Sequence, residues 1–222
     1  MILEDLLMAL ALFDLDNTLL NGDSDHAWGM FLADIGAVDA DEQKQKQDYF
    51  YQQYLNGELN IHEFCEFQFT VLTKNSLSQL QSWHDEYMRT VIEPMVINGK
   101  AELLEKHKDA GDDIVIITAT NNFITAPIAK RLGVETLIAT EAEFVDGAYT
   151  GKVKGTPCFQ KGKITRLNEW LQSKGKKMQE SYFYSDSIND LPLLEIVDHA
   201  IAVTPDDKLL AHAIKMGWPV ID

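Results

Sequence analysis

The stretch that decides the fold is Leu10-Ala-Leu-Phe-Asp14-Leu-Asp16-Asn-Thr18-Leu-Leu20. Its apolar run ends in two carboxylates separated by one residue, the pattern of a buried parallel strand that carries charge to the carboxyl edge of a sheet. Strand alternation places Asp14 and Asp16 on the same side, close enough to share a hard cation, and Thr18 adds a hydroxyl in the loop beyond. The stretch predicts a ligand site at a sheet edge, with Mg2+ as the first cofactor to test.

The same motif has a simpler interpretation as a capped turn. Asp, Asn and Thr side chains hydrogen-bond their own loop backbone, so a lone Asp-x-Asp-Asn-Thr match does not establish a site. An EF-hand calcium loop is excluded, because Leu19 stands at the sixth position, which needs Gly, and Asp25 at the twelfth, which needs Glu. The rest of the chain has to decide between a turn and a catalytic motif.

Composition favours a globular protein that acts on small molecules. The chain has 222 residues, of which 45% are hydrophobic, enough for one well-buried domain and a smaller accessory one. Its formal net charge of -16 repels phosphate backbones and anionic lipids, so we expect neither nucleic acid nor membrane as a partner. A small phosphorylated partner would need local cations to overcome this negative field, and a monomer or a homodimer is the expected assembly.

The cysteines and the N-terminus favour a cytoplasmic protein. Cys65 and Cys158 lie far apart and form no metal-spaced pair, so a reduced protein is the simpler interpretation. Residues 1–12 are apolar, but two acidic residues interrupt them and no basic region precedes them, so they predict neither a signal peptide nor a membrane span. The first seven residues are candidates for a dispensable extension, because a second methionine follows them.

Residues 23–94 have helical periodicity and almost no strand signal. A first helix is expected around Trp28–Ile35, with Ser24 or Asp25 available as its N-cap. The last helix of this region is expected over 77–92, because a proline follows shortly and disfavours continuation. We therefore expect a helical insert.

From Gly99 onward, helical and strand patterns alternate, which predicts parallel βαβ units. An Asp146-Gly147 pair adds a tight hairpin to this pattern. The predicted fold is α/β: a doubly wound parallel, Rossmann-like sheet with a helical cap domain inserted after the first strand. The predicted core is 1–22 and 95–222, and the predicted helical cap is 23–94.

Polar residues end the later strands of this core. Thr118-Ala119 ends one strand, and Asp186 ends another, with Asp190 four residues beyond it. Carboxyl ends of parallel strands lie along one edge, so these residues gather with the first two aspartates over one crevice, where crowded carboxylates need a cation. Each motif alone is also compatible with a helix N-cap, although a helix N-terminus with free N–H groups is a phosphate cradle.

Lys161 and Lys163 open the helix between these motifs. A lysine at such a place is by default a solvated surface charge. If either lysine points into the crevice, it would balance the carboxylates and hold a phosphoryl oxygen.

Taken in order, these features resemble a known family. Asp14-Leu-Asp16-Asn-Thr18, a strand-end Thr118, a helix-opening lysine and Ser185-Asp186-x-x-x-Asp190 resemble the four motifs of the haloacid dehalogenase-like hydrolases. The helical insert, the Asp146-Gly147 hairpin and Ile188-Asn189-Asp190 resemble the phosphoserine-phosphatase-like branch, which includes histidinol-phosphatases. The resemblance covers the core throughout, and the insert only by position and helical character.

The resemblance implies a role for each motif. Asp14 would be the nucleophile that forms an aspartyl-phosphate, and Asp16 the general acid and base. Thr118 would bind the phosphoryl group. Mg2+ would lie on Asp14, the Asp16 carbonyl and Asp186, and Asp190 would orient metal-bound water. These roles agree with the chemistry, because a carboxylate becomes a useful nucleophile when cations neutralise the phosphoryl group.

The resemblance also completes the expected phosphate site. Thr18, Ala119 and Asn189 stand inside or beside the motifs as candidate phosphate- or substrate-binding residues. The catalytic lysine is ambiguous: Lys161 matches the phosphoserine-phosphatase register, whereas relatives with a Gly-Lys-apolar pattern point to Lys163. We favour Lys163.

The expected function is a Mg2+-dependent phosphomonoesterase acting on a small metabolite, with a phosphoserine- or histidinol-phosphate-like substrate in view. A phosphotransferase or dehalogenase of the same superfamily is an alternative, but carbon–halogen hydrolysis has no alkoxide to protonate and would not call for Asp16 together with Asp186. A catalytically silent phosphate-binding or regulatory module is the other alternative. It is disfavoured because four carboxylates retained without a cation would be destabilising.

Substrate specificity is expected to reside in the insert. Its sole arginine, Arg89, would suit an acidic or zwitterionic metabolite, and an ion pair on its own helix surface is the competing interpretation. The other polar or aromatic candidates are His26, Trp28, Tyr49, Tyr51, Tyr54, His62 and Phe67.

Overall fold

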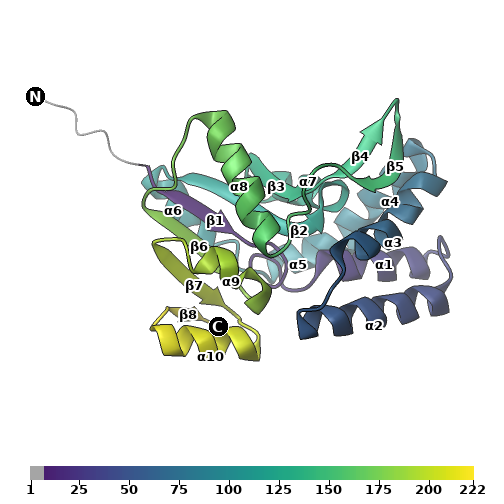
Figure 1. Ribbon diagram of the computed structural model, residues 1–222. Helices are drawn as coiled ribbons and strands as arrows, with labels where there is room; N and C mark the ends of the chain where they lie inside the picture. The colour runs from purple at the N-terminus through teal and green to yellow at the C-terminus, as the bar shows by residue number, and fades with distance from the viewer. Residues whose placement is uncertain (1–7) are drawn as a thin grey trace, which may run out of the picture.

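The computed structural model describes residues 8–222, so the prediction about residues 1–7 lies outside it. Among the described residues, a six-stranded parallel sheet has the order β3-β2-β1-β6-β7-β8 (Figure 1). Its strands are β1 (Leu10–Phe13), β2 (Asp113–Asn121), β3 (Thr136–Thr140), β6 (Ser181–Ser185), β7 (His199–Val203) and β8 (Val220–Ile221). The sequence-based prediction of an α/β fold with a parallel sheet is confirmed.

Alternation along β1 divides the core between the two faces of the sheet. Ala11 and Phe13 belong to the cluster that includes Leu104 of α6 (Leu103–Ala110) and Ile128 of α7 (Asn122–Arg131). Leu10 and Leu12 belong to the opposite cluster, with side chains of α8 (Lys161–Lys174), α9 (Leu191–Leu194) and α10 (Asp207–Met216). A strand that is buried on both faces has a continuous run of apolar residues, which is why the sequence of β1 indicated a central strand of the sheet.

The insert between β1 and β2 is helical, as expected. It consists of α1 (Ser24–Asp34), α2 (Ala40–Asn56), α3 (Ile61–Lys74), α4 (Leu77–Tyr87), the π-helical segment η1 (Met88–Ile92) and α5 (Glu93–Ile97). Figure 1 shows α1 to α4 gathered beyond one edge of the sheet, with the hairpin β4 (Ala142–Val145) and β5 (Ala148–Val153) beside them. The proposed division at residues 22/23 and 94/95 stays a prediction.

The two chain segments that connect this insert to the sheet lie side by side. The amide of Asn21 donates to the carbonyl of Met95, and the amide of Lys100 donates to the carbonyl of Leu19. A Cβ added at Gly99 would lie 2.2 Å from the Leu19 carbonyl oxygen, so only glycine allows this approach.

Two local predictions about the insert were wrong. The N-cap of α1 is Asp23, which accepts from the amides of Asp25 and His26, and neither Ser24 nor Asp25 caps the helix. The last helix also does not stop before Pro94. The π-helical turn over Met88–Ile92 shifts the hydrogen-bond register, and Pro94 then stands in the first turn of α5, where its missing N–H is tolerated.

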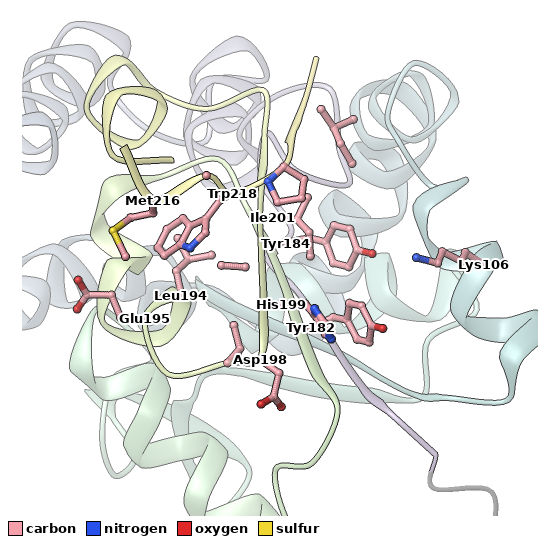
Figure 2. Close-up of a pocket in the computed structure, with 15 residues that line it drawn as sticks. Lys106, Tyr182, Tyr184, Leu194, Glu195, Asp198, His199, Ile201, Met216 and Trp218 are labelled. Atoms are coloured by element: carbon pink, nitrogen blue, oxygen red, sulfur yellow. The ribbon is translucent and has the colours of Figure 1, made fainter. Parts of the chain in front are cut away.

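One face of the sheet is left open beyond α6. A cavity of about 820 Å3 lies there, and Figure 2 shows Tyr182, Tyr184, Ile201 and Trp218 around it. The Tyr184 hydroxyl lies 2.9 Å from His107 Nε2, and His107 Nδ1 lies 2.7 Å from Asp112 Oδ2. None of the sequence motifs lines this cavity. Across the described residues, no helix is both long and apolar enough to cross a membrane.

Candidate active site

The predicted motifs meet in a smaller pocket of about 210 Å3 between the carboxyl edge of the sheet and the helical insert. Phe13 pairs with Ile116 on β2 and with Tyr184 on β6, and this register brings the ends of the three strands together. The predicted motif residues that line the pocket are Asp14, Asp16, Thr118, Ala119, Lys163, Asp186, Asn189 and Asp190, and the predicted insert candidates that line it are His26, Tyr51 and Tyr54. The strand-end argument therefore located one common site.

Lys163 occupies the centre of the carboxylate cluster. Its Nζ donates to Asp14 Oδ1 at 2.9 Å and to Asp190 Oδ2 at 2.7 Å, and only 2% of the residue is exposed. Burial alone would lower the pKa of Lys163, but Asp14 and Asp190 outweigh burial and raise it, so the lysine is charged. Ser185 Oγ donates to Asp190 Oδ2 at 2.7 Å and so holds the carboxylate that accepts from Lys163.

The start of α8 explains why Lys163, and not Lys161, enters the pocket. A Cβ at Gly162 would lie 2.0 Å from the Pro157 carbonyl oxygen, so glycine lets the first turn press against the preceding loop. In this arrangement Lys163 is buried, whereas Lys161 is exposed and does not line the pocket. The structure brings only the favoured lysine to the carboxylates.

Asp14 is buried beside that lysine. Its residue is 8% exposed, and burial, opposed by Lys163 and reinforced by Asp190, raises its pKa to about 6. An isolated buried carboxylate would be strongly disfavoured as an anion, so the lysine is what favours the ionised form of Asp14.

Asp16 faces the insert. Its Oδ1 accepts from the Ser24 amide at 2.7 Å, and its Oδ2 accepts from Thr120 Oγ1 at 2.8 Å. Burial, Asp23 and Asp14 raise the pKa of Asp16 to about 7, although the Ser24 bonds oppose the rise. A carboxyl group with such a pKa can both give and take a proton near neutrality. Thr120 was missed because its hydroxyl reaches Asp16 only across strands.

Asp186 and the threonines complete the sheet edge. Thr18 Oγ1 donates to Asp186 at 3.3 Å, and Thr118 Oγ1 accepts from the Thr120 amide at 3.2 Å. Burial first, and then Asp14 and Asp190, raise the pKa of Asp186 well above its usual value. A cation between Asp14 and Asp186 would remove this unfavourable repulsion.

Only some of the carboxylates in the pocket are suited to binding a hard cation. Across residues 8–222, no three His, Cys, Asp or Glu side chains are arranged as a ready metal-binding group. Asp16 is bonded to Ser24 and Thr120, and Asp190 to Lys163 and Ser185. The Asp14 and Asp186 carboxylates and the Asp16 carbonyl are the oxygen atoms that fit such a role, with water as the remaining ligands.

The insert forms the opposite side of the pocket. Tyr54 Oη donates to Ser187 at 2.7 Å, and Asn189 Nδ2 donates to the Tyr54 carbonyl at 3.3 Å, so Asn189 also joins the insert to the core. Further lining residues from this side are Asp23, Asp25, His26, Gln47, Phe50, Tyr51 and Phe64. We call the side of Lys163, Asp14 and Asp190 the lysine half, and the side of Asp23, Asp25 and Gln47 the cap half.

Several predicted specificity residues lie elsewhere. Arg89 is exposed and does not line the pocket, so the structure does not bring it to the site. Trp28 is buried in the hydrophobic core. Asp23 and Asp25 were not predicted as pocket residues, because at the start of a helix both match an N-cap pattern.

The comparisons with known proteins agree with this fold and site. A family model, the haloacid dehalogenase-like hydrolases, matches residues 11–195. A histidinol-phosphatase of Neisseria meningitidis is 44% identical over 217 residues, covering 96% of this chain and 98% of the relative. A phosphoserine phosphatase of Mycobacterium tuberculosis is 32% identical over 222 residues, covering 97% of this chain and 71% of the relative.

Solved structures give the same result. A Bordetella pertussis protein of unknown function superposes with a TM-score of 0.91 at 45% identity, with 97% of this chain and 98% of that chain covered. A substrate-bound phosphoserine phosphatase superposes with a TM-score of 0.67 at 17% identity, covering 96% and 92%, which shows the shared fold. The fold and the clustered carboxylates define a hydrolase with its site at the carboxyl edge of a doubly wound sheet. The chain belongs to the haloacid dehalogenase-like hydrolase family, and with phosphatases as its relatives it is itself a phosphatase.

Proposed function

We propose that this phosphatase hydrolyses a small phosphomonoester through an aspartyl-phosphate on Asp14, with Mg2+ as cofactor. The observation that carries the proposal is the buried Lys163, held between Asp14 and Asp190. A lysine with this surrounding neutralises the nucleophilic carboxylate and can hold a phosphoryl oxygen as negative charge shifts toward the leaving group. A silent phosphate-binding module would not need a second carboxyl group, Asp16, poised near neutrality on the other side.

The proposed reaction has two displacements on phosphorus. In the first, an Asp14 carboxylate oxygen bonds to phosphorus as the ester P–O bond breaks, and Asp16 gives its proton to the departing alkoxide. In the second, Asp16 takes a proton from water as the water oxygen bonds to phosphorus and the acyl phosphate bond breaks. Phosphate leaves, and Asp14 and Asp16 return to their starting states.

The chain's other residues position the phosphoryl group. Thr118 and Ala119 lie on β2 and line the pocket, where a hydroxyl and backbone amides can donate to phosphate oxygens. Bound Mg2+ would be held by Asp14, Asp186 and the Asp16 carbonyl, and it would supply positive charge that offsets the phosphate and the carboxylates.

The cap half suggests what the phosphate is attached to. Asp23 and Asp25 line it together with Phe50 and Phe64, and none of the described lining residues is an arginine. A substrate carboxylate would be repelled there, whereas a nitrogen cation would be attracted. We therefore propose the phosphate ester of a nitrogen-containing alcohol, of the histidinol phosphate type, which the name of the Neisseria meningitidis relative also favours over phosphoserine.

The test measures phosphate release from histidinol phosphate, phosphoserine and an aryl phosphate, with and without Mg2+. We expect release to require Mg2+, and kcat/KM to be highest for histidinol phosphate. Asp16→Asn should still become phosphorylated by the aryl phosphate, because a good leaving group needs little protonation, and should then hydrolyse slowly. Absence of a burst in this variant, or Mg2+-independent release, would contradict the mechanism. Cytoplasmic location and a monomeric or dimeric state stay predictions.

A further inference from the structure

Tyr87 is a buried polar side chain that the proposed reaction does not use. It is the last residue of α4, and none of its surface is exposed. Its hydroxyl donates to the backbone carbonyl of Ser24, in the first turn of α1, at 2.6 Å. A buried hydroxyl needs a partner, and this one finds it on a segment distant in sequence.

The backbone of Ser24 connects Tyr87 to Asp16. While the Ser24 carbonyl accepts from Tyr87, the Ser24 amide donates to Asp16 Oδ1 at 2.7 Å. Asp23 Oδ1 caps the next two amides of α1, those of Asp25 and His26, and so leaves the Ser24 amide to Asp16. A single residue is therefore held on one side by Tyr87 and on the other side holds the carboxylate.

The ring of Tyr87 is fixed by the same helix that supplies Ser24. Its centroid lies 5.1 Å from that of Trp28, in an edge-on arrangement, and 5.6 Å from that of Phe31. Both aromatic side chains belong to α1 and are buried. Such packing restricts the ring, so the direction of the hydroxyl is set before it bonds to Ser24.

The π-helical turn that follows Tyr87 explains why this side chain faces the interior. Four residues after Tyr87, where an α-helix would place the next buried side chain, Val91 is only half-buried. Ile92, five residues after Tyr87, is fully buried instead. The wider turn thus lets Tyr87 and Ile92 share the buried face. π-Helical turns are rare and occur frequently at functional sites.

The charge of Asp16 reaches the Tyr87 hydroxyl. Burial first, and then Asp16, raise the pKa of Tyr87. The hydroxyl therefore keeps its proton and stays a hydrogen-bond donor at neutral pH.

We propose that Tyr87 is a positioning residue for the general acid and base: its hydroxyl holds the Ser24 backbone, and the Ser24 amide holds Asp16. The proposal rests on the proposed function, in which Asp16 carries the proton. Thr120 holds the second oxygen of Asp16, so loss of the Tyr87 hydroxyl should loosen the carboxylate without releasing it.

The test compares Tyr87→Phe with wild type on phenyl phosphate and para-nitrophenyl phosphate. Phenolate is the poorer leaving group and needs more proton donation, so a loosened Asp16 should slow the phenyl ester more. We expect kcat/KM to fall about threefold to tenfold for phenyl phosphate, and about twofold or less for the nitrophenyl ester. The ratio of the two kcat/KM values is the readout, because a merely structural role would not change it.

Tyr184→Phe is the matched control, because it also removes a buried tyrosine hydroxyl from a hydrogen bond, but outside the pocket. It should leave the ratio unchanged. An unchanged ratio in Tyr87→Phe, or an equal fall for both esters, would assign Tyr87 a structural role and overturn the proposal. Tyr87→Met, whose flexible side chain fills irregular space, is the second variant if Tyr87→Phe does not fold, and the same ratio decides.

A double variant tests whether Tyr87 acts through Asp16. Asp16→Asn should shift the ratio by itself, and adding Tyr87→Phe should then shift it no further, because coupled residues are not additive. A further shift of about threefold or more would contradict the proposal. If wild type hydrolyses neither ester, or if Asp16→Asn leaves the ratio unchanged, the proposed function fails. That outcome differs from a failure of the Tyr87 assignment alone, in which Asp16→Asn shifts the ratio and Tyr87→Phe does not.

Discussion

The two halves of the pocket treat buried charge in opposite ways. In the lysine half, Lys163 donates to both Asp14 and Asp190, and Ser185 supports Asp190. In the cap half, Asp25 has one oxygen bonded to Gln68 and the other without a partner among the described residues. The difference teaches that the charges of the lysine half are paired within the chain, whereas the cap half keeps buried carboxylate oxygen without a partner among the described residues.

The distinction between the two halves of the pocket would fail most completely if the nucleophile did not lie in the lysine half. Asp14→Asn removes the attacking oxygen, and we expect kcat to fall on the order of 10^4-fold or more, by analogy with removal of other nucleophiles. Turnover of an aryl phosphate and labelling of the protein with radioactive phosphate are the measurements. Accumulation of covalent phosphate on Asp14→Asn would place the nucleophile elsewhere.

Lys163→Met tests whether the buried pairing is essential to both activity and stability. Loss of the cation should lower kcat by about 100-fold to 1000-fold. It also leaves Asp14 and Asp190 buried without a counter-charge, a change that typically lowers the free energy of unfolding by about 3–5 kcal/mol. Lys161→Met, on the same helix but exposed, should change neither quantity appreciably. Equal effects of the two substitutions, measured by kinetics and denaturant unfolding, would refute the distinction between the lysines.

Removal of Mg2+ tests whether a bound cation offsets the repulsion between the Asp14 and Asp186 carboxylates. We expect EDTA to lower turnover by about 100-fold, since a bound cation contributes several kcal/mol to stabilising the transition state. Added Mg2+ at a hundredfold excess over Kd should stabilise the fold by about 2.7 kcal/mol. Asp186→Asn should weaken this stabilisation, and thermal unfolding with and without Mg2+ measures it. Hydrolysis that survives EDTA unchanged would exclude the proposed cofactor.

The sheet-face cavity sharpens the comparison, because it is larger than the pocket and its Tyr184 hydroxyl is already paired with His107. Tyr184→Phe leaves His107 Nε2 without its 2.9 Å partner and should lower the free energy of unfolding by about 1–2 kcal/mol, with kcat/KM unchanged. Tyr182→Phe, on the same strand (Figure 2), leaves the His107 bond in place and is the control. A fall in kcat/KM specific to Tyr184→Phe would show that this cavity contributes to the reaction.

The sequence by itself was enough to predict the parallel sheet and a common crevice at its carboxyl edge. The apolar run that ends at Asp14, and the polar ends at Thr118 and Asp186, predicted one crevice because parallel strands end at a common edge. The structure brings these residues into one pocket. Helix periodicity likewise predicted the insert, although an N-cap pattern shared by neighbouring polar residues could not distinguish Asp23 from Ser24 or Asp25.

Only the tertiary structure decided which side chains point where. Lys163 is buried and bonded to Asp14, whereas Lys161 is exposed, a difference that composition does not contain. The sequence allowed Arg89 either to bind substrate or to form an ion pair on its own helix, and the structure places it away from the pocket. The orientation of the Asp25 carboxylate is set by a hydrogen bond from Gln68, 43 residues away. The physical reason is that backbone periodicity is local, whereas burial and hydrogen-bond partners are set by segments distant in sequence.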